Sequence, residues 1–243
     1  MNILLYKHNI LFLLSLCCLF FSNITYAVVI PETSRVVYNL DKNEQSLYIY
    51  NKNKYPVLVQ LWSDNGDVSS SPEVESDSPV IPLPAIFRLA EDESKNIRLI
   101  KVDDNVAKDR ETLYWLNIYE VPPLPDVSMN DEDSSVLMVT VRTQIKVILR
   151  PENLFKMIED IPKKVTFEID NGHLILINNS PFYITISSLT LTERDRDSLY
   201  DGMIEPFSKI PVDWNSGNKI ESLFINYIND QGSEVSMTIK NKN

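Results

Sequence analysis

Few side chains in this sequence could carry out catalysis. Both cysteines and one of the two histidines lie in residues 1–27, where a basic start, a short apolar run and a small-residue end are typical of a cleaved secretory signal. Cleavage after Ala27 would leave His173 as the sole histidine and no cysteine as a nucleophile or soft metal ligand. A lone histidine beside a turn is more often a solvated side chain than a general base.

The other chemical options are equally thin. Acidic residues cluster at Asp103-Asp104 and at Asp131-Glu132-Asp133, but neither cluster has the ligand spacing of a calcium loop. Five scattered glycines form no phosphate-binding loop, and a net charge of −11 opposes nucleic-acid binding. The apolar run in residues 1–27 is too short to span a bilayer. The sequence therefore predicts a binding protein rather than an enzyme, with no cofactor, no metal, no nucleic acid and no stable membrane insertion.

The residues that could bind a partner must be positioned by β-strands. Short runs of alternating apolar and polar residues, rich in Val, Ile, Tyr and Thr, follow one another with Pro, Asn, Asp or Ser between them. These runs are 35–38, 46–50, 57–62, 86–89, 96–100, 113–119 and 137–149. About seven short strands over this length predict an immunoglobulin-like sandwich. We expect loops at 69–79 and 122–135.

A second set of runs follows the joint at 150–154, where Pro151 ends the long strand. Asn171-Gly172 separates two alternating runs and predicts a hairpin. The runs of the second set are 165–169, 173–177, 183–191, 222–228 and 234–239. We therefore divide the chain into a signal at 1–27, one all-β domain at 28–152 and a smaller one at 153–243.

Several segments, in order along nearly the whole chain after Ala27, resemble the periplasmic pilus-assembly chaperones of the chaperone–usher system. Lys108–Asn117 resembles the motif D-R-E-S-x-[FY]-x-x-N, and Gln144–Pro151 resembles a strand ending in I-K-x-x-x-R-P. Further matching segments are 34–38, 81–89, 179–183, 203–208 and 227–232. The resemblance implies two immunoglobulin-like β-sandwich domains in an L-shaped, boomerang-like arrangement.

The sequence also departs from this pattern. Gln144 stands where a basic residue is common, and Thr112 replaces the serine of the D-R-E-S motif. The loop at 122–135 is somewhat long for the short-loop branch of the family, but the cysteine pair of the long-loop branch is missing. These features favour the short-loop branch.

The resemblance implies a function and a donor strand. Chaperones of this family bind and cap pilus subunits in the periplasm by lending them a β-strand, and they deliver the subunits to an outer-membrane usher. The resembling donor residues are Leu137, Val139 and Val141, which would alternate into an apolar groove of the subunit. Alternation alone allows the other interpretation equally well, in which these three side chains face the core of their own sandwich.

Two cations resemble the pair that holds the carboxylate at the end of a subunit. Arg35 would supply a bidentate fork and Lys146 a point charge. The competing interpretation makes Lys146 a charge that protects an edge strand and Arg35 a solvated charge. Lys146 also has the opposite parity to Val141, so a regular strand would place their side chains on opposite faces unless a bulge intervenes.

Three further charges, Arg98, Glu111 and Asp230, resemble a salt-bridge cluster that joins the two domains. Three solvated charges are the alternative. For the whole chain, the first rival function is an exported structural or adhesive β-sandwich component of a pilus, and the second is an exported β-sandwich enzyme.

Overall fold

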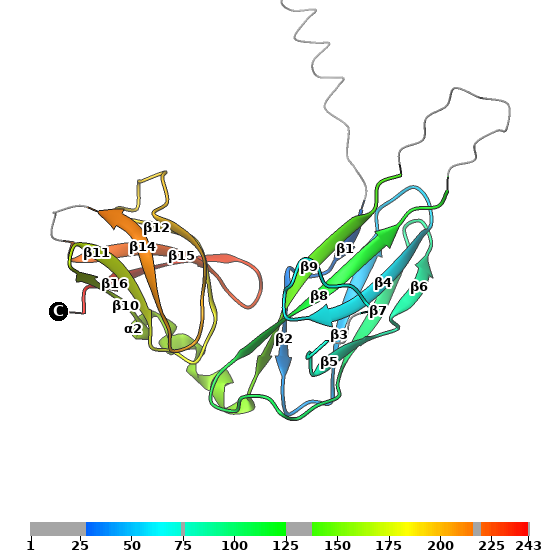
Figure 1. Ribbon diagram of the computed structural model, residues 1–243, viewed down its shortest axis with the longest axis horizontal. Coiled ribbons are helices and arrows are strands. Elements are labelled where there is room, and N and C mark those ends of the chain that lie inside the picture. The colour runs from blue at the N-terminus through cyan, green and yellow to red at the C-terminus, as the bar shows by residue number, and fades with distance from the viewer. Residues whose placement is uncertain (1–27, 74–75, 125–137, 216–219, 243) are drawn as a thin grey trace, which may run out of the picture.

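The computed structural model describes residues 28–73, 76–124, 138–215 and 220–242, which form two β-sandwich lobes arranged as an open V (Figure 1). The predicted signal, residues 1–27, lies outside the described residues. Two short helical segments, η1 (Glu152–Asp160) and α2 (Ile161–Lys164), follow the vertex. The prediction of an all-β protein with two sandwich domains in an L-shaped arrangement is confirmed.

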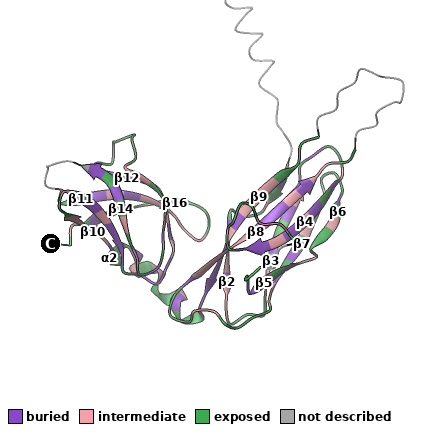
Figure 2. Ribbon diagram, viewed as in Figure 1, coloured by how far each residue is buried: buried purple, intermediate pink, exposed green. Residues whose placement is uncertain are grey.

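Nine described strands build the first lobe. They are β1 (Val29–Pro31), β2 (Arg35–Asn39), β3 (Glu44–Asn51), β4 (Val57–Asp64), β5 (Val80–Leu83), β6 (Ile86–Leu89), β7 (Ser94–Lys101), β8 (Thr112–Val121) and β9 (Val141–Arg150). One sheet has the order β1-β3-β7-β5 and the other has the order β2-β9-β8-β4-β6. Along β4, Val57, Val59 and Leu61 are buried between the sheets, while Leu58 is exposed on the outer face (Figure 2). The period-two pattern of the sequence thus sets the core.

The second lobe repeats this plan with fewer strands. They are β10 (Val165–Asp170), β11 (His173–Asn178), β12 (Ile184–Thr190), β13 (Tyr200–Ile204), β14 (Lys209–Asn215), β15 (Ser222–Ile228) and β16 (Glu234–Lys240). The sheets have the orders β10-β11-β14 and β13-β12-β15-β16. The predicted hairpin is confirmed: Asn171 and Gly172 have φ angles of 51° and 85°, and Asp170 pairs with His173 on either side.

The joint between the lobes contains helical structure that the sequence analysis did not predict. Pro151 ends β9, and the 3₁₀ segment η1 leads into the single turn of α2. Leu154 and Ile161 are buried in the core of the second lobe, and Ile158 packs against it. These three residues have the spacing i, i+4, i+7 of a helix face, which was the available signal.

Four strands were also missed, and three of them contain proline: Pro31 is the last residue of β1. Pro82 lies in β5 and Pro211 in β14, and both strands are at the edge of their sheet. A proline inside a run argues against a central strand but is compatible with an edge strand. The other two missed strands are the short β1 and β13, of three and five residues.

Strand β9 is paired over different lengths on its two sides. β8 pairs with β9 from Val141 to Leu149. The parallel partner on the other side, β2, pairs only with residues 146–150. In the described part of the chain, residues 141–145 of β9 therefore have no strand partner on that side. This segment is called the free edge below.

Candidate functional site

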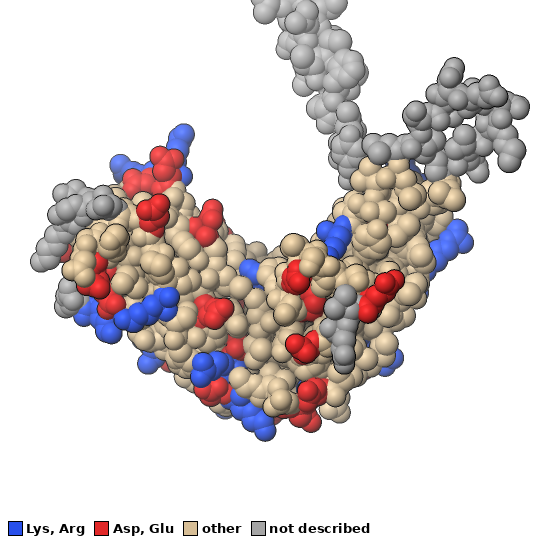
Figure 3. All heavy atoms as spheres, in the orientation of Figure 1, with Lys and Arg blue, Asp and Glu red and all other residues tan. Residues whose placement is uncertain are grey.

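Two cations lie where the free edge ends. Arg35 and Lys146 are direct partners in the register of β2 and β9. Each also reaches the second lobe: Nη1 of Arg35 donates a hydrogen bond to the carbonyl oxygen of Ile228 at 3.1 Å, and Nζ of Lys146 donates one to Oγ1 of Thr185 at 3.0 Å. The predicted pair is thus brought together where the first lobe contacts the second. Figure 3 shows an open notch between the two lobes.

Burial disfavours the charged forms of Arg35 and Lys146 and lowers the pKa of both side chains. The pKa of Lys146 is lowered to about 8, first because the ammonium is desolvated and second because Arg35 repels it. Burial also lowers the pKa of Arg35, an effect that the carboxylates of Asp230 and Glu111 oppose. Nε of Arg35 is buried without a hydrogen-bond partner among the described residues. Two desolvated cations with a spare donor favour an anion between them.

The donor residues that can be described lie at the other end of the free edge. Val139 precedes β9 and is 59% exposed, and Val141, its first residue, is 36% exposed. These two valines therefore do not fill the core of their own lobe, although they share the parity of Ile145 and Val147, which do. Leu137 lies outside the described residues.

The register of β8 and β9 shows whether Val141 and Lys146 lie on the same face of β9. β8 and β9 pair residue by residue from Val141 to Leu149 without a shift, so β9 contains no bulge in this range. The side chains of Val141 and Lys146 therefore project from opposite faces of a regular strand.

A buried salt-bridge cluster joins the lobes. Nε of Arg150 lies 2.6 Å from Oε1 of Glu111, and its two terminal nitrogens contact the two carboxylate oxygens of Asp230 at 2.6 and 2.8 Å. The second oxygen of Glu111 accepts a hydrogen bond at 2.7 Å from the backbone N–H of Tyr183 in the second lobe. Burial raises the pKa of Glu111, and Arg150 opposes this shift. The cluster therefore holds its charges by mutual pairing across the joint.

The prediction that Arg98 belongs to this cluster is wrong. Arg98 alternates with the core residues Ile97 and Leu99 on β7, so it projects from the outer face of its sheet. There it contacts Glu44 at 3.4 Å, and both side chains are about half exposed, at 54% and 53%. The cluster arginine is Arg150. Its place at the end of β9, directly before the proline of the joint, was the signal in the sequence.

A tight turn of the second lobe also touches the first. Gly232 has a φ of +80°, and a Cβ built on it would lie 2.8 Å from Oγ of Ser34, the residue before Arg35. A side chain at this position would therefore be strained and would push the turn away from the start of β2.

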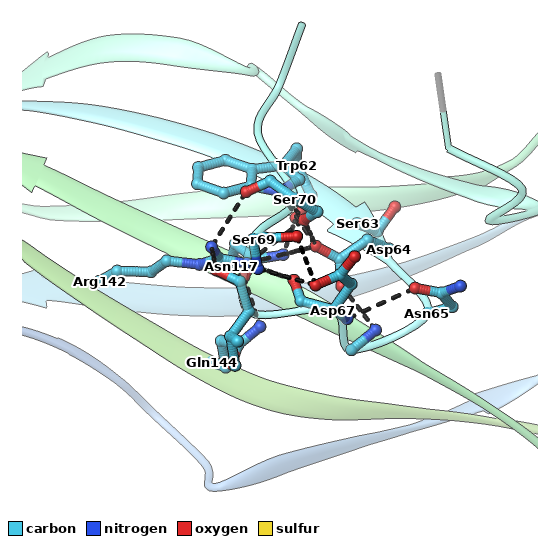
Figure 4. Close-up of polar contacts among 12 residues, drawn as sticks. Trp62, Ser63, Asp64, Asn65, Asp67, Ser69, Ser70, Asn117, Arg142 and Gln144 are labelled. Atoms are coloured by element: carbon cyan, nitrogen blue, oxygen red, sulfur yellow. Dashed lines mark hydrogen bonds and ion pairs between the residues drawn. The ribbon is translucent and has the colours of Figure 1, made fainter. Parts of the chain in front are cut away.

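The free edge is supported from the outer face of its sheet by a polar network (Figure 4). Arg142 donates from Nε to Oδ1 of Asn117 at 2.8 Å and from Nη1 to the carbonyl oxygens of Val68 and Ser70 at 2.8 and 3.0 Å. Its guanidinium lies 4.8 Å from the centre of the Trp62 ring. Arg142 thus ties the start of β9 to the loop after β4.

The hub of this network is the fully buried Asn117 on β8. Its Oδ1 accepts hydrogen bonds from Arg142 and from Nε2 of Gln144, both at 2.8 Å, and its Nδ2 donates to Oδ2 of Asp64 at 2.7 Å. Gln144, which replaces a basic residue of the family pattern, is therefore used as a neutral partner of Asn117.

The described residues contain no group of three or more His, Cys, Asp or Glu side chains that could hold a metal ion. His173 is exposed at the start of β11. Among the described residues, no helix is long and apolar enough to cross a membrane.

The fold and these contacts match a known family along nearly the whole chain. Residues 28–155 match the model for the pili and flagellar-assembly chaperone PapD N-terminal domain, and residues 160–239 match that for the C-terminal domain of the pili assembly chaperone PapD. The chain therefore belongs to the pili-assembly chaperones, which are a family of chaperones rather than enzymes.

Individual relatives agree with this assignment. The chain is 30% identical to the chaperone protein MrkB of Klebsiella pneumoniae over 226 residues, covering 91% of this chain and 95% of that protein. It is also 30% identical to the probable fimbrial chaperone YadV of Escherichia coli over 227 residues, covering 90% and 92%. The crystal structure of the CupB2 chaperone of Pseudomonas aeruginosa is similar with a TM-score of 0.73 and 27% identity, covering 87% of this chain and 99% of that one.

Removing a charge from the cluster should loosen the joint. We expect Asp230→Ala to lower the free energy of unfolding by about 1–3 kcal/mol, less than the loss typical of a fully buried pair because the Asp230 side chain is 30% exposed. Small-angle scattering should show a broader distribution of lobe separations. The matched control, Arg98→Ala, should change stability by less than about 0.5 kcal/mol, and equal losses in the two variants would contradict the role of the cluster.

Removing the Arg142 guanidinium should loosen the free edge without unfolding the lobe. We expect Arg142→Met to speed amide hydrogen exchange in residues 64–71 and 141–145, because the carbonyl groups of the loop and Asn117 lose their donor. Exchange in β15 and β16, in the other lobe, provides the internal control. Unchanged exchange in both segments would show that the network is not needed to order β9.

Proposed function

We propose that this chain is a non-enzymatic periplasmic chaperone that caps pilus subunits by donating β9 as a strand and then delivers them to an outer-membrane usher. The observation that carries the proposal is the free edge of β9, which begins at the exposed Val141, two residues after the exposed Val139, and ends at two desolvated cations. An unpaired apolar edge is an aggregation hazard in a protein that has no partner for it. A subunit that lacks one strand is such a partner.

The length of the edge specifies what can bind there. A strand added beside residues 141–145 occupies the side of β9 that β2 occupies from residue 146 onward. The added strand must therefore stop at Arg35 and Lys146. A chain end placed there presents an α-carboxylate, the anion that two converging cations favour.

The direction of the added strand follows from the same geometry. Its C-terminal end lies next to Lys146, so it runs along β9 in the order from Val141 to Lys146, parallel to the donor. The anchored carboxylate fixes the register. Val139 and Val141 then project on one side of the donor strand into the apolar groove that the missing strand leaves in the subunit.

The positions of Arg35 and Lys146 also depend on the angle between the lobes. Arg35 and Lys146 both contact the second lobe, and the cluster of Glu111, Arg150 and Asp230 holds that lobe in place. We propose that the cluster serves binding by fixing where the two cations meet. The domains would then join at residues 152 and 153.

The proposed location is the periplasm. Export by the signal at 1–27, with cleavage after Ala27, would bring the chaperone to the compartment in which subunits and usher meet. Membership of the pili-assembly chaperone family supports this location.

Removing the anchor should abolish capture but leave the protein folded. We expect Lys146→Ala and Arg35→Ala to weaken binding of the cognate subunit by about 2–5 kcal/mol, the usual loss when one partner of a desolvated charge pair is truncated. Val139→Glu should weaken it by placing a charge in an apolar groove. Arg98→Ala, another arginine on the first lobe, is the control and should bind like the wild type.

The measurement is coexpression with a subunit from the same gene cluster and recovery of the complex on an affinity tag, with circular dichroism of each free variant. Folded anchor variants that recover wild-type amounts of complex would contradict the carboxylate site. If the wild-type protein recovers no subunit and instead assembles into fibres, it is a pilus component and not a chaperone.

Capture should also weaken at alkaline pH. Lys146 has a lowered pKa of about 8 in the free protein, and a bound carboxylate would raise it, so binding takes up a proton above pH 8. Affinity should therefore be greatest below pH 8 and fall by up to about tenfold per pH unit above it. The Lys146→Arg variant keeps its charge in this range and should show a flatter profile by fluorescence titration. Parallel profiles for the two proteins would exclude Lys146 as the titrating group.

A further inference from the structure

The ammonium group of Lys146 has no carboxylate beside it to stabilise its charge. None of the ion pairs in the described part of the chain includes this lysine. Burial and the repulsion of Arg35 on β2 both disfavour its charged form, and from β12 it meets only the neutral hydroxyl group of Thr185. The carboxylates of Asp230 and Glu111 act on Arg35. The charge of Lys146 therefore needs another source of stabilisation.

The neighbouring strand provides an aromatic ring instead of a carboxylate. Trp115 on β8 is the direct register partner of Lys146 on β9, so both side chains project from the same face of the sheet. Nζ of Lys146 lies 5.6 Å from the centre of the Trp115 ring. The face of an aromatic ring carries partial negative charge and attracts a cation at this distance, most strongly for tryptophan and for a desolvated cation. The ring therefore favours the charged form of Lys146 and opposes the effect of burial.

A glycine lies directly against this ring. Gly66, in the turn after β4, has a φ of +94°, and a Cβ built on it would lie 2.5 Å from Nε1 of Trp115. The N–H of Gly66 donates a hydrogen bond to Oδ1 of Asp64 at 2.8 Å. Oδ2 of Asp64 in turn accepts one from Asn117, the hub of the polar network (Figure 4). The network that supports the free edge therefore also holds the turn against Trp115.

We propose that Trp115 is a positioning residue for the anchor formed by Arg35 and Lys146, and that its ring keeps the ammonium group in place and charged before a subunit binds. The inference rests on the proposed capture of subunits and adds a residue to it. The turn at Gly66 fixes the ring from behind.

A ring suits this role better than a carboxylate. A carboxylate beside Lys146 would stabilise the charge but would also compete with the carboxylate of the subunit. The ring stabilises the charge and leaves the hydrogen-bond donors available. Of the three N–H groups of the ammonium, one donates to Thr185, and the others have no acceptor in the part of the chain that the structure describes. The subunit carboxylate thus finds a charged group with free donors.

Fluorinated tryptophans test the ring while nearly preserving its shape. Each fluorine atom withdraws electron density from the face of the ring and weakens its attraction for a cation. Analogues with increasing numbers of fluorine atoms are introduced in place of Trp115 alone, and the pKa of Lys146 is measured in the free protein by NMR with labelled lysine. We expect the pKa to fall stepwise, by about 0.5–1 unit over the series.

The same analogues in place of Trp62 provide the matched control. That ring lies 4.8 Å from the guanidinium of Arg142, so its fluorination should leave the pKa of Lys146 unchanged. A ring that only excludes water from Lys146 would keep this effect when fluorinated. An unchanged pKa across the series at Trp115, or an equal fall in the series at Trp62, would therefore overturn the proposal.

A pair of glycine variants tests the support of the ring. We expect Gly66→Ala to weaken capture of the cognate subunit several-fold, because the new methyl group displaces Trp115. Gly172→Ala is the control: Gly172 has a similar φ of +85°, but a Cβ built on it has nothing within 4 Å. It introduces the same backbone strain without contact with a ring and should capture the subunit like the wild type. Equal capture by the two folded variants would overturn the role of Gly66.

The pKa measurement uses the free protein and needs no subunit, so it separates this proposal from the proposed function. A stepwise fall in pKa combined with wild-type capture by Lys146→Ala would support the contact between ring and lysine and contradict the carboxylate site. A flat series of pKa values combined with lost capture by Lys146→Ala would support the carboxylate site and overturn the role of Trp115.

Discussion

In the proposed function, the capture of a subunit depends on how far β2 covers β9. Over residues 146–149 the strand has a partner on each side and belongs to the sandwich, and over 141–145 it has only β8. Backbone groups on the uncovered side must be satisfied by water or by another chain. The boundary between the two halves is the pair Arg35 and Lys146, so the point at which the protein stops pairing with itself is also the point at which it carries two desolvated cations.

Contacts with the second lobe help to bury the two cations at this boundary. Without Ile228 and Thr185, both cations would face water, and their attraction for a carboxylate would be largely screened. The cluster around Arg150 holds those contacts in place with buried charges that satisfy one another. Buried ion pairs add little net stability compared with apolar packing. Their benefit here is geometric, because they fix the direction in which one lobe meets the other.

Sequence alone predicted the fold where local patterns and packing agree. Alternating runs identified the central strands, and Asn171-Gly172 identified a hairpin, because both signals act within a few residues. Pro82 and Pro211 concealed two strands, since only the complete sheets show that these strands lie at an edge. The position of Arg150 directly before Pro151 placed it at the joint, but its contact with Asp230, 80 residues away, could not be predicted from local sequence. The contacts of Arg142 with the loop after β4, 72 to 74 residues away, were equally beyond local reasoning.

The alternation of β9 also limits how the segment can diverge among related chains. Val141, Ile145 and Val147 share one face, yet the first is open to a partner and the other two are enclosed by their own lobe. Under the proposed function, an exchange of one apolar residue for another at Val141 would alter what the protein recognises and leave its core intact. An insertion or deletion of a single residue between Val141 and Ile145 would instead exchange the two faces at once. Under the proposed function, substitution alone would therefore suffice to change the partner, whereas a change in the length of the segment would disturb the core.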